Sequence, residues 1–520
     1  MNSGVGPGRA PRLLLAFSAG AVTVFGFAPF HVALLPFATL AVLFWLWQQA
    51  QVPREAALDG LAFGMGLFSV GISWISLALE TFGVPRVIAF PGMLGLVAYL
   101  SVYPALAGWI VARLTRPDTS SRLVAAFAAW ALAEWLRGTL LTGYGWLAIG
   151  YTQLLPNVAL PLGGFAPVGG VYLVSLAIAA CAAVLVHTIN GIAAGRARAI
   201  PLAPAAIALL FGAGALTARF VWTQPVGAPL AVSLVQGNVA QHLKFDPAYR
   251  ARNYAMYEEL VQRAKGRLVV LPESAFTVFL DEVPGDVLER VRDAGLARNG
   301  DVLVGLFTLD APPAGSGRDG DDPLIYNSVI SLGAASPQLY RKHHLVPFGE
   351  AIPLRPVFGW FLNRVLNIPL ADQAAGPAMQ RPFAVAGQRV AINICYEDVF
   401  GAELAEVANA ATLFVNVTND VWYGHSIGAW QHNQIAAMRA LELGRPMLRA
   451  TNTGITSAIA HDGRVIGELP WFTQGILEVA IAGREGQTPF VRWGDGFAAA
   501  LAGAVLLAAI AASRRRIRFA

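Results

Sequence analysis

The chain has 520 residues, of which 56% are hydrophobic and 13% are charged, and its mean hydropathy is +0.54. These values exclude an ordinary soluble protein, and the length allows more than one domain. The formal net charge of +5 comes mainly from arginines beside apolar segments and at the C-terminus. This placement is typical of membrane topology, and we expect no binding to nucleic acid.

Seven apolar segments precede residue 223, and each has about the 17–25 residues that a helix needs to cross a bilayer. An eighth segment covers 496–512. The sequence therefore predicts an α-helical membrane bundle of eight transmembrane helices, with a transmembrane domain at 1–222 and a last helix with a basic tail at 493–520. The seven N-terminal segments are 12–29, 31–48, 57–79, 88–111, 123–141, 166–188 and 200–221.

Arginines next to these segments predict the orientation in the membrane. With seven spans before residue 223, the arginine-rich loops and the tail at 514–518 all lie on one side, which the excess of positive charge marks as cytoplasmic. The polar segment 223–492 then lies outside the cytoplasm. One span more or fewer would reverse this assignment.

Segment 223–492 has the polarity of a globular domain, and short β-rich runs alternate in it with helical patterns. This alternation predicts a layered α/β domain. The expected helices are 248–265, 284–298, 401–410 and 428–443, and the expected strands are 228–235, 267–271, 301–307, 325–332, 389–394, 412–417, 455–460 and 464–468.

Cys395 directly follows the predicted strand 389–394 and precedes a helical pattern. A turn from strand to helix exposes its apex residue, and the backbone N–H of Tyr396 would point at a carbonyl oxygen attacked by the thiol. The alternative is an inert cysteine in the core. Cys181, the second of two cysteines, lies in an apolar segment, so we expect a free thiol at Cys395.

Two further residues carry groups that would activate a thiol. Glu273 follows an apolar run ended by Pro272, at the strand end where α/β sheets place ligands. Lys342 is one of three lysines in an arginine-rich chain, and an ammonium lowers the pKa of a neighbouring thiol. In isolation, Glu273 is also compatible with a capping residue and Lys342 with a basic surface loop. No second cluster has ligand spacing beside His343, so we expect no metal site.

Three motifs in this order resemble the nitrilase, or carbon–nitrogen hydrolase, superfamily with its Glu-Lys-Cys triad: Pro-Glu-Ser at 272–274, Arg-Lys-x-x-Leu-Val-Pro-Phe-Gly-Glu at 341–350 and Cys-Tyr-Glu at 395–397. Further motifs resemble the apolipoprotein N-acyltransferase family over nearly the whole chain. They lie at 134–138, 236–238, 419–424, 430–432 and 438–446. The resemblance implies that 223–492 is a nitrilase-like αββα four-layer sandwich.

The resemblance also implies a reaction without a cofactor. A phospholipid donates an acyl chain to Cys395, and the thioester then acylates the N-terminal amine of a diacylglyceryl-modified cysteine on a lipoprotein. Glu273 acts as the base and Lys342 holds the oxyanion. The partners are this phospholipid, the diacylated lipoprotein and the bilayer of the bacterial inner membrane, with the catalytic domain periplasmic, the C-terminus cytoplasmic and the protein a monomer.

Supporting roles follow from the same motifs. Glu350 is expected to support Lys342 or the acceptor amine, or else to be a surface acid. Glu397 orients the nucleophile turn, and Tyr396 shapes the pocket. Phe245 stands where many relatives have Trp, so stacking is kept but any role of an indole N–H is lost. Trp422 and Tyr423 line the acyl or acceptor site rather than a remote core.

Two features outside the triad leave alternatives open. Segment 352–370 is apolar enough to be a membrane-dipping lid with Trp360 and Phe361 in the bilayer interface, or it packs in the core. Glu134 and Arg137 lie three residues apart on one helix, and charges buried in a membrane need partners. We expect them to pair with each other for a structural reason, to contact the globular domain or to bind a lipid head group. The competing functions are a membrane-anchored nitrilase-type amidohydrolase and a transporter or receptor whose nitrilase-like domain only binds.

Overall fold

The computed structural model describes residues 8–81, 83–195, 202–311, 323–351 and 373–515. Trp360 and Phe361, and with them the predicted lid, lie outside these ranges. The chain forms two compact units. The first comprises Met1–Ser76, Arg86–Val221 and Arg492–Ala520, and the second comprises Leu77–Pro85 and Trp222–Val491.

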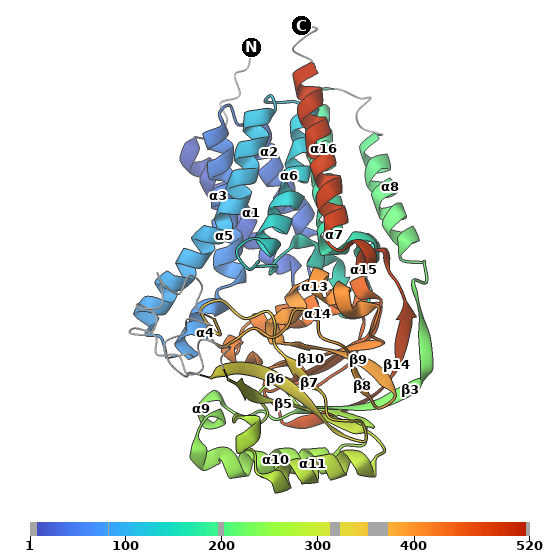
Figure 1. The fold of residues 1–520 in the computed structure, drawn as a ribbon. Helices are drawn as coiled ribbons and strands as arrows, with labels where there is room; N and C mark the ends of the chain where they lie inside the picture. The colour runs from blue at the N-terminus through green and yellow to red at the C-terminus, as the bar shows by residue number, and fades with distance from the viewer. Residues whose placement is uncertain (1–7, 82, 196–201, 312–322, 352–372, 516–520) are drawn as a thin grey trace. The chain divides into compact units, whose positions relative to one another are not determined.

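The first unit is helical (Figure 1), and each of the eight predicted apolar segments overlaps one of its long helices. Helix α3 packs against both α1 and α5. A Cβ atom at Gly66 would lie 2.0 Å from the carbonyl oxygen of Phe17, and one at Gly60 would lie 2.2 Å from that of Pro104. Glycine at these positions therefore allows the backbones to approach closely, as is typical of helices in membranes. The helices are α1 (Arg9–Thr23), α2 (Leu35–Gln49), α3 (Pro53–Gly71), α5 (Arg86–Leu114), α6 (Ser120–Thr139), α7 (Ala166–Ala193), α8 (Leu202–Thr217) and α16 (Gly496–Arg515).

The structure supports fewer spans than the eight predicted. Among the described residues, three helical segments are long and apolar enough to cross a membrane, and a fourth span results if α3 and α4 (Trp74–Thr81), bent by 50°, count as one. Helices α1 and α2 have 15 residues each, about 22 Å of rise against about 30 Å of hydrocarbon. Helix α6 carries three charged side chains. The chain is thus a membrane protein by its apolar helices, and the number eight stays a prediction. The three segments are Arg86–Leu114, Pro161–Ala193 and Gly496–Arg514.

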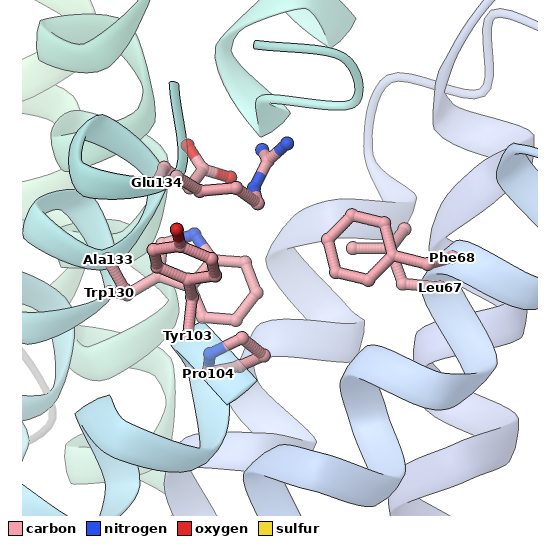
Figure 2. Close-up of a pocket in the computed structure, with 8 residues that line it drawn as sticks. Leu67, Phe68, Tyr103, Pro104, Trp130, Ala133 and Glu134 are labelled. Carbon is pink, nitrogen blue, oxygen red and sulfur yellow. The ribbon is translucent and has the colours of Figure 1, made fainter. Parts of the chain in front are cut away.

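Glu134 and Arg137 both fasten α6 to the loop that follows it. Glu134 Oε1 accepts a hydrogen bond from the N–H of Ile149 at 3.0 Å, and Arg137 Nη1 donates to the carbonyls of Tyr144, at 2.6 Å, and Trp146. These contacts give both charges a structural role, and head-group binding stays a prediction. Both side chains also line a small pocket (Figure 2), together with Leu67, Phe68, Tyr103, Pro104, Trp130 and Ala133.

The second unit contains two six-stranded mixed sheets. Strands β3, β4 and β5 run parallel in one sheet, and β9, β10 and β11 run parallel in the other. The first sheet has the order β14 (Gly475–Gly486), β3 (Thr223–Gln236), β4 (Leu268–Val270), β5 (Asp301–Asp310), β6 (Leu324–Gly333) and β7 (Leu339–Arg341). The second has the order β13 (Val465–Glu468), β12 (Ser457–Ile459), β11 (Met447–Thr451), β10 (Leu413–Thr418), β9 (Gln388–Ile394) and β8 (Phe383–Val385).

The sheets are the two inner layers of a sandwich, because β11 packs on β3 across them. Helices α10 (Arg250–Arg263) and α11 (Gly285–Ala297) cover the first sheet, and α13 (Gly401–Ala408) and α14 (Gly428–Leu443) cover the second (Figure 1). Apolar side chains of α10, α11 and the first sheet form a continuous buried core. The predicted αββα arrangement is confirmed. Four of its strands, β7, β8, β11 and β14, were not predicted.

Candidate active site

Glu273 lies just after β4, at the carboxyl end of the parallel strands. Its side chain is buried, and both oxygens accept hydrogen bonds: Oε1 from Asn327 Nδ2 at 2.7 Å and Oε2 from the N–H of Asn419 at 2.8 Å. Burial raises the pKa of Glu273, although the charge of Lys342 opposes this shift. A carboxyl group whose pKa is raised toward neutrality is suited to general-base catalysis.

Lys342 follows β7 and is fully buried. Its N–H donates to the carbonyl of Asn327 at 2.8 Å, which continues the pairing of β7 with β6. Its Nζ lies 4.0 Å from Glu273 Oε1 and 2.7 Å from Glu350 Oε1. Burial alone would lower the pKa of Lys342, but the charges of Glu350, Glu273 and Cys395 outweigh it, so the pKa is raised. Lys342 is therefore a permanent ammonium beside Glu273.

Cys395 directly follows β9 and begins a 3-10 helix, Cys395–Val399. Its φ of 52° lies in the left-handed region, which non-glycine residues occupy only under strain. The carbonyl of Cys395 accepts hydrogen bonds from Asn416 Nδ2 at 3.1 Å and His432 Nε2 at 3.3 Å, and these hold the turn. Burial raises the pKa of the thiol, and the charge of Glu273 raises it further. The resting group is a thiol, so its attack on a carbonyl requires a base.

Glu350 contacts Lys342, one of the two partners expected for it. While Oε1 binds Lys342 Nζ, Oε2 accepts a hydrogen bond from the N–H of Val346 at 2.9 Å. This second bond fixes the carboxylate, since it closes a short loop between Val346 and Glu350. The contact holds Lys342 in place and keeps it charged.

Glu397 joins the nucleophile turn to the segment after Lys342. Its carboxylate accepts hydrogen bonds from the N–H groups of Ile394 at 2.6 Å, His343 at 2.7 Å and His344 at 3.1 Å. The hydroxyl of Tyr340 donates to it as well, at 3.0 Å. One buried carboxylate thus fixes the residue before Cys395 and the two residues after Lys342, which supports the orienting role predicted for it.

The predicted aromatic residues differ in their burial. Tyr423 is buried, and its ring lies 5.8 Å from that of His432, whose Nε2 lies 3.3 Å from the carbonyl oxygen of Cys395. Tyr396 is buried with its ring 5.1 Å from that of Phe400. Trp422 is half-buried, and Phe245 is 41% exposed. Tyr396 and Tyr423 are therefore placed near Cys395, while the positions of Trp422 and Phe245 leave their roles as predictions.

A fully buried cluster of charged side chains lies behind Cys395, and the sequence analysis did not predict it. His432 Nε2 lies 3.0 Å from Asp398 Oδ1, and His432 Nδ1 lies 2.9 Å from Asp420 Oδ1. Arg449 pairs with both acids. The signals were present, since Asp398 follows Cys395 by three residues and Asp420 and His432 fall within recognised motifs.

Models of two families match the chain. The apolipoprotein N-acyltransferase N-terminal domain matches residues 19–184, and the carbon-nitrogen hydrolase domain matches residues 231–490. An apolipoprotein N-acyltransferase of Nitrosomonas europaea is 46% identical over 500 residues, covering 96% of each chain. Those of Ralstonia nicotianae and Chromobacterium violaceum are 42% and 40% identical, covering 96% and 97% of this chain and 93% and 94% of their own lengths. The chain therefore belongs to the apolipoprotein N-acyltransferase family.

Proposed function

We propose that this protein transfers a fatty acyl chain from a membrane phospholipid to the N-terminal amine of an S-diacylglyceryl-cysteine on a lipoprotein. Membership of the family supports the activity. The observation that assigns the chemistry to residues is the buried group of Glu273, Lys342 and Cys395, in which a carboxylate and an ammonium lie 4.0 Å apart and both act electrostatically on the thiol.

In the first half-reaction, Glu273 takes the proton of Cys395, and the sulfur attacks the ester carbonyl carbon of the phospholipid. Lys342 Nζ and the N–H of Tyr396 stabilise the oxyanion of the tetrahedral intermediate. The ester C–O bond then breaks. The lysophospholipid leaves with the proton returned by Glu273, and the acyl chain remains on Cys395 as a thioester.

In the second half-reaction, the amine of the acceptor cysteine attacks the thioester carbonyl carbon while Glu273 removes a proton from the amine. The C–S bond breaks, the amide is released, and the thiolate of Cys395 recovers the proton. Conversion of a thioester to an amide is downhill, so no nucleotide is consumed. This property suits a site outside the cytoplasm.

The same proposal assigns roles to the parts of the chain. Segment 223–492 is the catalytic domain, on the periplasmic side of the inner membrane, and 1–222 with 493–520 hold it there, with the C-terminus cytoplasmic and the enzyme monomeric. Trp422, Tyr423 and Phe245 contact the acyl chain or the acceptor.

Intact-mass spectrometry of the purified protein after incubation with phospholipid tests the proposal. The wild type and a Cys181→Ala control should gain the mass of one fatty acyl group, and Cys395→Ala should not. Cys181 is a suitable control because it is the other cysteine and is also buried. Release of ammonia from amides without any acyl adduct would instead establish the amidohydrolase.

A further inference from the structure

Lys244 is a second lysine inside the catalytic site. It is the last residue of the short helix α9 (Gln241–Lys244), and it is 3% exposed. Its Nζ donates a hydrogen bond to the backbone carbonyl of Glu273 at 2.9 Å. Within the part of the chain that the structure describes, no carboxylate lies within ion-pair distance of this Nζ. A buried ammonium without such a partner is costly, so its retention needs a reason.

The pKa of Lys244 depends on its burial and on the charges of Glu273 and Cys395. Burial lowers the pKa of Lys244 to about 8, and the opposing contributions come from Glu273 and Cys395. In turn, the charge of Lys244 lowers the pKa of Glu273. Lys342 differs from Lys244 in having an acid beside it, because Glu350 largely compensates the charge of Lys342. Lys244 thus contributes positive charge to the reacting pair that no paired acid offsets.

We propose that Lys244 is a positioning residue of the acyl transfer: its ammonium fixes the backbone of Glu273 and stabilises the ionised forms of Glu273 and Cys395. The inference deepens the proposed function and rests on it. When the proton leaves Cys395, negative charge moves from Glu273 to the sulfur, and Lys244 interacts with both groups. Its charge therefore stabilises the negative charge whether that charge lies on Glu273 or on the sulfur.

A purely structural role would need only the hydrogen bond to Glu273. Glutamine at position 244 carries an N–H donor, one bond nearer the backbone than that of lysine, but no charge, whereas methionine, of about the length of glutamine, has neither. Lys244→Gln therefore separates the charge from the hydrogen bond. Lys265→Gln is the matched control, since Lys265 is exposed.

The test measures alkylation of Cys395 by iodoacetamide against pH, in the full-length protein with Cys181→Ala as background. Only the thiolate reacts, so the profile reports the pKa of Cys395. In Lys244→Gln and Lys244→Met the rate of alkylation at each pH below about 8 should fall about tenfold, and single-turnover acyl loading near pH 7 should fall about tenfold as well. The gap from the wild type should narrow above about pH 8, where Lys244 itself loses its charge. Lys265→Gln should match the background.

A wild-type profile in Lys244→Gln, with a change only in Lys244→Met, would overturn the proposal in favour of a structural hydrogen bond. Unfolding of both variants would also overturn it, because Lys244 would then be required for the fold. Alkylation needs no acyl donor, so a shifted profile in a protein that phospholipid fails to acylate would refute the proposed function while retaining Lys244 as a residue that tunes the nucleophile.

Discussion

Replacement of Glu397 by glutamine tests how the site is held together. Each oxygen of Glu397 accepts a backbone N–H, Oε2 from Ile394 and Oε1 from His343 and His344. In either orientation the new amide NH₂ therefore faces at least one N–H donor. A buried hydrogen bond to a charged group contributes about 1.5–3 kcal/mol. Loss of the single bond to Ile394, the smaller disruption, should lower the free energy of unfolding by about 2 kcal/mol.

For a domain of this size, such a loss corresponds to a fall in Tm of about 4–8 °C. The rate of acyl loading should fall about 100-fold, because displacement of a catalytic group by about 1 Å has that effect. Thermal unfolding in detergent and single-turnover acyl loading measure the two changes, with Glu406→Gln, an exposed glutamate of α13, as the control. A Glu397→Gln variant with the Tm and loading rate of the control would refute the linking role of Glu397.

Three other changes test the surrounding contacts. Glu273 must be ionised to act as a base, so acyl loading is lost as the pH falls through its pKa. Asn327→Leu removes a hydrogen bond that lowers this pKa, so the acid limb of the pH profile of acyl loading should move up by about one pH unit. An unmoved acid limb would contradict the role of Glu273 as the base. Desolvation lowers the pKa of His432, but nearby carboxylates raise it to about 9. The protonated imidazole therefore stabilises the fold fully below about pH 6.5, and this stabilisation, about 3 kcal/mol, is lost as the pH rises through 9. Tm should fall over this range in the wild type but not in His432→Gln, and parallel curves of Tm against pH would contradict the role of His432. Glu350→Gln should slow single-turnover loading about tenfold, because Lys342 loses the acid that raises its pKa, whereas an unchanged rate would leave Glu350 as a surface acid.

Of the three residues proposed to react, Glu273 and Cys395 could be predicted because each follows an apolar run that forms a strand, whereas Lys342 was predicted from the rarity of lysine in the chain and from its motif. In the structure Glu273, Lys342 and Cys395 follow β4, β7 and β9. The groups that hold them could not be predicted in the same way. Asn327 lies inside β6 and His432 inside α14, where a polar residue in a sequence is more typical of a solvent-facing position than of a buried hydrogen-bond donor.

The unpredicted strands have similar causes. Arg449 in β11 makes this central strand look exposed, yet its side chain is buried because Asp398 and Asp420 compensate its charge. Strand β14 pairs with β3 alone at a sheet edge and is half-exposed, so its apolar pattern is weak. In the helical unit, apolar segments mark the helices, but the predicted segment 12–29 runs past the end of α1 at Thr23, since the turn that joins α1 to α2 is itself apolar.

The motifs at 272–274, 341–350 and 395–397 resemble those of carbon–nitrogen hydrolases, so the proposed triad alone does not decide between water and an amine as the acceptor. The decision depends on whether water reaches the thioester. Glu273, Lys342 and Cys395 are 6%, 0% and 7% exposed, and Tyr396 and Tyr423 beside them are buried. Few waters therefore reach Glu273, the base that would activate them. An acyl chain on Cys395 would exclude still more water, which favours an acceptor that brings its own nucleophile together with apolar groups. A diacylated cysteine has both.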